Sequence, residues 1–122
     1  MKFDSNLPIY LQIMDEIKRL IITDVYTPSQ KIPSVRELAV SFGVNPNTVQ
    51  RALSELEREG LLNSERTSGR FICDDITLIQ KLKKNMIEQK TDQYIDEVRM
   101  FGFDDEAIIQ NVRERLYNGK VN

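Results

Sequence analysis

The chain has 122 residues, of which 40% are hydrophobic and 30% charged, with few aromatic residues and no tryptophan. This length and composition fit one small, helix-rich domain with an appendage, and the chain is too short for most elaborate enzyme folds. A lone cysteine excludes an internal disulfide, and the lack of histidine removes the usual ligands of zinc and the usual catalytic base. We therefore expect no metal, no cofactor and no enzymatic activity, and we interpret Cys73 as a buried strand residue.

The net charge of −2 counts against nucleic acid as a partner, but the charge is unevenly distributed. Residues 1–73 hold nine basic and nine acidic side chains, whereas residues 74–122 hold eight basic and ten acidic ones. Residues 1–6 lack an apolar signal core, and the apolar run 20–22 is too short to cross a bilayer. These features predict a cytoplasmic protein that does not bind membranes.

The first predicted element is a helix over residues 8–23, which begins at Pro8, where a missing amide is tolerated. Its apolar stripe has helical spacing and consists of Ile9, Ile13, Ile17, Leu20 and Ile21. Residues 24–30 contain a turn-forming cluster, and Lys31 and Ile32 form a candidate for a very short strand.

Two further helices are predicted from their caps. Ser34 and Glu37 have the spacing of a capping box, which starts a helix that continues to about Phe42, where Gly43 ends it. The third helix starts with Asn45 as its N-cap and proline as its first residue, and Gly60 ends it. Its buried face is predicted to be Val49, Ala52, Leu53 and Leu56.

Residues 61–65 and 70–73 are predicted as two strands joined by a four-residue turn with a glycine, which is typical of a hairpin. The chain then continues with a long helical stripe that ends at Gly102. Asp104 or Asp105 caps a last helix, which ends near residues 118–119 and is predicted to turn Ile108, Ile109, Val112 and Leu116 inward.

The order helix, helix, turn, helix, hairpin predicts a mainly α-helical fold with a small β-hairpin, a winged helix-turn-helix over residues 1–73. Residues 74–122 are predicted to form a short helical dimerisation region. Its apolar load, which includes Leu82, Val98, Phe101 and Leu116, exceeds what two helices hide against each other. We therefore expect a homodimer.

The third helix also carries the chemistry that points to DNA. Its polar face is Asn47, Gln50, Arg51 and Ser54, with Thr48 near the start, and it has no acid before Glu55. Amide, hydroxyl and guanidinium groups of this kind bind base edges and phosphates. Further cations come from three other places, namely Lys31, Arg36, and the pair Arg66 and Arg70 at the hairpin.

Four segments in order, residues 32–39, 43–53, 56–61 and 68–72, resemble the GntR family of bacterial regulators, and the resemblance covers residues 7–73. It implies a winged helix-turn-helix that binds double-stranded DNA. Carried over by position, it implies contacts from Arg36, Asn45, Asn47, Thr48, Gln50 and Gly69.

The chain departs from the family pattern where many members have arginine in place of Pro46 and Gln50, and often threonine in place of Arg70. Their base contacts therefore do not transfer, and Arg51 and Arg70 are candidate substitutes. The start of the third helix and the short tail resemble the YtrA-like branch, which implies a small helical dimerisation region and repression. A symmetric dimer presents two identical readers, which predicts an inverted-repeat site. The resemblance names no small-molecule effector.

Three alternatives stand beside this interpretation. The acidic pairs 74–75 and 104–105 would serve an enzyme, although adjacent acids at helix starts are more simply caps. A winged helix used only for protein contacts has the same fold, and fold does not imply function. The tail would also be covered without dimerisation if it packed on the first helix of its own chain.

Overall fold

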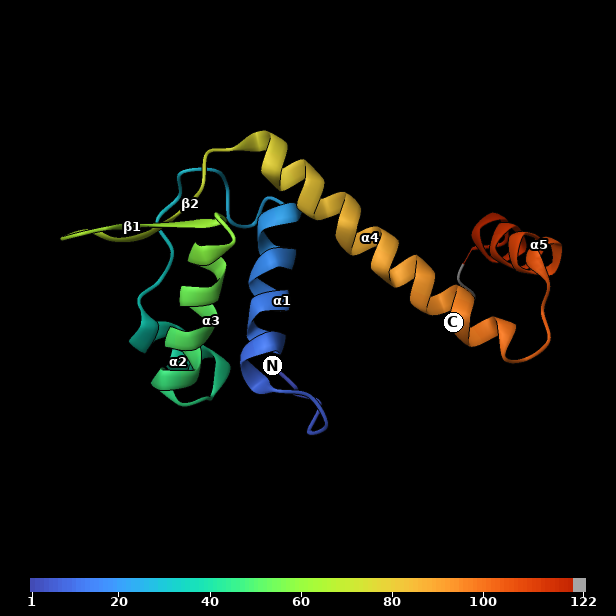
Figure 1. Cartoon of the computed structure of the whole chain (residues 1–122), viewed down its shortest axis with the longest axis horizontal. Helices are drawn as coiled ribbons and strands as arrows, with labels where there is room; N and C mark the ends of the chain where they lie inside the picture. Colours follow the sequence, from blue (N-terminus) through green and yellow to red (C-terminus); the bar gives the residue numbers. More distant parts are fainter. Residues whose placement is uncertain (120–122) are drawn as a thin grey trace. The chain divides into compact units, whose positions relative to one another are not determined.

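The computed structural model describes residues 1–119 and folds them into five helices and one antiparallel hairpin (Figure 1). In chain order the elements are α1 (Ile9–Ile22), α2 (Val35–Phe42), α3 (Pro46–Arg58), β1 (Leu62–Glu65), β2 (Gly69–Ile72), α4 (Ile76–Arg99) and α5 (Asp105–Tyr117). The predicted fold class is confirmed by this order.

The chain forms two compact units, of which the first spans Met1–Lys83 and the second starts at Lys84. The division falls inside α4, because Leu78, Ile79 and Leu82 at the start of this helix pack against the core of the first unit. The predicted boundary at residue 73 separates a DNA-binding domain from a dimerisation region, and this division by function stays a prediction. Residues 120–122 of the predicted tail lie outside the described part of the chain.

Local capping signals place the helix ends of the first unit. The Ser34 hydroxyl accepts a hydrogen bond from the Glu37 amide, and the Glu37 carboxylate accepts one from the Ser34 amide, so the predicted capping box is present. Gly43 ends α2 in the left-handed conformation at φ 69°, which costs glycine little because it has no Cβ. Asn45 caps α3, and Pro46 occupies its first turn, as predicted.

The core of the first unit lies between α1 and α3, which run side by side (Figure 1). Its fully buried side chains include Ile13, Ile17, Val49, Leu53 and Leu56. Each such aliphatic side chain contributes about 1.5–3 kcal/mol by leaving water. An ion pair of 3.0 Å between Lys18 Nζ and Glu59 Oε1 also joins α1 to the end of α3.

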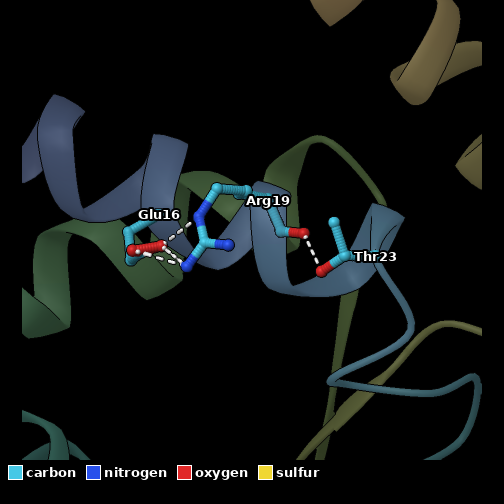
Figure 2. A network of polar contacts seen from close by, with 3 residues as sticks. All are labelled: Glu16, Arg19 and Thr23. Carbon is cyan, nitrogen blue, oxygen red and sulfur yellow. Dashed lines mark hydrogen bonds and ion pairs between the residues drawn. The ribbon is translucent and has the colours of Figure 1, made fainter. Parts of the chain in front are cut away.

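The last turns of α1 are held by polar contacts (Figure 2). Arg19 Nε donates to Glu16 at 2.6 Å, and the Thr23 hydroxyl donates to the Arg19 carbonyl at 2.7 Å. The Arg19 guanidinium is therefore already paired within α1. In the loop that follows, burial first and the Glu16 charge second raise the pKa of Tyr26.

The hairpin forms the wing, which we define as residues 62–72. Its strands pair in antiparallel register from Leu62 opposite Ile72 to Glu65 opposite Gly69. Lys31 forms a single bridge with Phe71 on the other edge of β2. The predicted short strand at residues 31–32 is thus one bridge long, and it connects the wing to the segment that precedes α2.

In the second unit, α4 and α5 meet through a hydrogen bond of 2.9 Å from Asn111 Nδ2 to the Tyr94 hydroxyl. Asp104, one of the two predicted caps, starts α5 by accepting from the Ala107 amide. Among the four residues predicted to face inward, Ile108 is buried. The prediction is wrong for the other three, which are exposed because they line an open groove between α4 and α5: Ile109 by 49%, Val112 by 38% and Leu116 by 76%.

Candidate nucleic-acid interface

One face of α3 forms an exposed polar ridge, which we define as Asn47, Gln50, Arg51 and Ser54. The first turn of the helix contains no acid. Gln50 Nε2 donates to the Ser54 hydroxyl at 3.2 Å, so this amide lies along the ridge. Amide and guanidinium groups on a helix of this kind match the donor and acceptor pattern of base edges in the major groove.

At the start of α3, some of the groups predicted to bind DNA form hydrogen bonds within the helix itself. Asn45 Oδ1 accepts from the Asn47 amide at 2.8 Å, and the Asn45 carbonyl accepts from the Thr48 amide. The Asn45 side chain therefore keeps its NH₂ group and one lone pair of Oδ1 for a ligand. Thr48 is half-buried, in contrast to the exposed residues of the ridge.

Arg36 lies in the first turn of α2 with its side chain exposed, and within residues 1–119 it forms no ion pair. The nearby capping box carries the negative charge of Glu37. The hydrogen bond from the Ser34 amide is the main cause that lowers the pKa of the Glu37 carboxyl, and the Ser34 side chain and the charge of Lys31 lower it further. Burial opposes these effects. Arg36 is thus available to an external ligand.

A hollow of about 260 Å³ lies between the start of α2 and the wing. It brings together Lys31 and Ser34 from the segment that leads into α2 and Gly69 and Arg70 from the wing. Gly69 has φ 105°, and a Cβ added there would lie 3.1 Å from Lys31 Cε. Glycine therefore permits both the turn of the wing and the close approach of the lysine.

The two predicted arginines of the wing differ in their surroundings. Arg66 lies exposed in the turn, whereas Arg70 Nε donates to Glu57 Oε1 of α3 and its side chain is only 19% exposed. Ser64 donates to the same Glu57 oxygen at 2.6 Å. Burial acts to raise the pKa of Glu57, but the hydrogen bonds from Ser64 and Arg70 and the Arg70 charge outweigh it and lower the pKa.

Arg51 has an aromatic neighbour rather than an acidic one. Its guanidinium carbon lies 3.8 Å from the centroid of the Tyr10 ring in α1. Arg51 is one residue beyond Gln50, which places it about 100° further around the helix. It lies at the edge of the ridge that faces α1, while Glu57 and the wing lie at the other edge.

The structure thus groups Lys31, Gly69 and Arg70 at one hollow and places Arg51 against α1. Neither Tyr10, which contacts Arg51, nor Glu57, which pairs with Arg70, was predicted from the sequence as a site residue. A signal existed for Tyr10, because it has helical spacing to the buried Met14 and Ile17. No local pattern singles out Glu57, whose partners are distant in sequence.

A family model described as bacterial regulatory proteins, gntR family, matches residues 9–72. The chain belongs to the GntR family. The resemblance expected from the four motifs is therefore confirmed, and the protein is a DNA-binding transcriptional regulator of this family rather than an enzyme. In the described range 1–119, no helix of this regulator has the length and the apolar character needed to cross a membrane.

Two of the similar proteins match most of the GntR chain, and a third matches a smaller part of it. The transcriptional repressor YtrA of Bacillus subtilis is 37% identical over 90% of this chain and 85% of its own length. The structure of a GntR family transcriptional regulator from Listeria monocytogenes has a TM-score of 0.86 at 38% identity and covers 92% of this chain and 98% of its own. The DNA-binding domain of AraR, solved in complex with operator ORX1, has a TM-score of 0.54 at 36% identity and covers 60% of this chain and 90% of that one.

Proposed function

We propose that this regulator is a repressor that binds an inverted-repeat operator as a homodimer. The observation that carries the DNA-binding part is the exposed ridge of α3, which has no acid in its first turn. The similarity to YtrA, a repressor, supports the direction of regulation. Because the ligand is double-stranded DNA, we also propose that the protein acts in the cytoplasm.

In this proposal α3 is the recognition helix and enters the major groove. Arg36, Asn47 and Gln50 read base edges, because a guanidinium offers two parallel donors and a side-chain amide offers one donor and one acceptor, and these patterns distinguish bases. The similar AraR DNA-binding domain was solved in complex with an operator, which supports DNA binding by this chain. The full set of proposed contacts is Lys31, Arg36, Asn45, Asn47, Thr48, Gln50, Arg51, Arg66, Gly69 and Arg70.

The remaining contacts are assigned to the DNA backbone. Lys31 and Arg66 are exposed cations near the wing and neutralise phosphates. Gly69 lets the wing backbone approach a strand closely. Arg70 keeps guanidinium N–H groups besides the one directed at Glu57, and together with Arg51 it supplies positive charge that the family pattern places at Pro46 and Gln50.

The proposed dimer rests on the second unit. An apolar groove of about 540 Å³ lies between α4 and α5, and Ile95, Ile109, Val112 and Leu116 are among its lining residues. Apolar side chains gathered in this way lose their water contact most simply against the same surface of a second copy. Two-fold symmetry then presents two identical readers, which predicts an inverted repeat.

Selection of bound sequences from a random DNA pool by the full chain tests the proposal. We expect an enriched two-fold-symmetric site, whose affinity falls steeply between about 50 and 200 mM salt as counterions are released. Lys90→Ala is the negative control for operator binding. It removes one exposed positive charge from the second unit, outside the proposed interface, and should leave operator affinity unchanged. A selection without enrichment, or affinity insensitive to salt, would favour the protein-contact alternative.

A further inference from the structure

The contact between Arg51 and Tyr10 joins the edge of the recognition helix to α1. The guanidinium carbon is 3.8 Å from the ring centroid, and Tyr10 is half-buried. Within residues 1–119 Arg51 forms no ion pair, so its charge is uncompensated by any carboxylate there. The tyrosine holds the cation without neutralising it.

This stack has a defined place because α1 and α3 are locked together by other contacts. Ile13 and Val49, which lie near Tyr10 and Arg51 in sequence, are both fully buried in the shared core. The Lys18–Glu59 ion pair joins the same two helices further along. The ring therefore lies at a fixed position relative to the ridge of α3 before any ligand arrives.

Stacking leaves the binding groups of the arginine free. The N–H donors of a guanidinium lie in its plane, whereas the ring contacts its face. A side chain that is already ordered also loses less conformational freedom when it meets an anion. Arg51 thus has the orientation and the free donors of a preorganised anion contact.

The position of Arg51 favours a phosphate as that anion. Asn47 and Ser54 occupy the centre of the ridge, and the Gln50 amide is directed toward Ser54. A helix in the major groove directs the centre of such a face to the bases and its edges to the two strands. Arg51 lies at the edge toward α1, so its donors face a backbone rather than the floor of the groove.

We propose that Tyr10 is a positioning residue that holds Arg51 for contact with a DNA phosphate. The inference deepens the proposed DNA interface and rests on it. Tyr10 acts on DNA only through Arg51 and contributes nothing in its absence. This dependence separates a positioning role from a general contribution to folding.

A double-mutant cycle on the full chain tests the inference, with affinity measured on the selected operator and on unrelated DNA. Tyr10→Leu, which removes the ring face, should weaken binding to both DNAs by about 2- to 10-fold. Tyr10→Phe keeps the ring and should bind like the wild type. Arg51→Ala should reduce the salt dependence by about one phosphate contact, and adding Tyr10→Leu to it should cause no further loss.

Several outcomes would overturn the inference. These are wild-type affinity for Tyr10→Leu, a loss by Tyr10→Phe as large as that by Tyr10→Leu, and an equal loss by Tyr10→Leu with and without Arg51. A loss confined to the operator would instead assign Arg51 to a base. If the wild-type chain binds neither DNA, the proposed interface fails and the inference fails with it, whereas wild-type binding without coupling refutes the inference alone.

Discussion

Arg70 in β2 donates its Nε–H to Glu57 in α3, and this hydrogen bond joins the wing to the recognition helix. Ser64 in β1 donates to the same carboxylate oxygen, so both strands of the wing are held by one side chain. The wing of a winged helix reaches DNA only if its angle to the recognition helix is kept. In the proposed interface, Glu57 therefore positions the wing although it is itself an acid.

We expect Glu57→Gln to lower the free energy of unfolding by about 1 kcal/mol, because it removes a charge-assisted contact that is partly shielded from water. Glu55→Gln is the matched control, since Glu55 pairs with the exposed Arg58 one turn along the same helix. That change should cost about 0.5 kcal/mol or less. Urea denaturation measures both, and equal effects would contradict a special role for Glu57.

The lowered pKa of Glu57 predicts a pH dependence with a definite sign. A carboxyl whose pKa is lowered in the folded state stabilises the protein when the pH is above the ordinary glutamate pKa of 4.5. This stabilisation is lost as the pH falls below that value. The stability difference between the wild type and Glu57→Gln should therefore be constant near neutral pH and shrink below pH 4.5. A difference that grows on acidification would refute the assignment.

Arg36→Ala should weaken operator binding by about 1–3 kcal/mol, because the arginine is exposed, unpaired within residues 1–119 and proposed to read a base. Binding to unrelated DNA should fall less. Arg19→Ala is the control, since Arg19 lies in the same unit but is occupied by Glu16 (Figure 2). Equal losses of affinity for operator and unrelated DNA would show that Arg36 contacts a phosphate and not a base.

Leu116→Asp should convert the proposed dimer into monomers, because it places a charge in the apolar groove of the second unit. Operator affinity should then fall by about 100-fold, since the two half-sites no longer share an effective concentration. Gln93→Asp adds the same residue at an exposed position of α4 as a control. Sedimentation and operator titration decide the matter, and a Leu116→Asp chain that remains dimeric would exclude this surface.

Much of the first unit was predictable from the sequence because its signals act over one helical turn. The Ser34–Glu37 capping box, the left-handed Gly43 and the Asn45 cap each depend on residues within a few positions. The buried face of α3 follows from helical periodicity alone, and Val49 and Leu53 are fully buried as predicted. The ridge opposite that face follows with it.

The sequence did not determine which side chains contact each other between different helices and strands. Whether Arg51 stacks on Tyr10, and whether Arg70 is held by Glu57, depends on how α1 and the wing pack against α3. The same holds for Ile109 and Val112, whose helical spacing predicts an apolar face but not what covers it. By itself, the sequence determined the elements, their caps and the composition of the ridge. Only the tertiary structure decided which charges are held and which stay free, because these pairings join residues whose separation in sequence has no fixed relation to their distance in space.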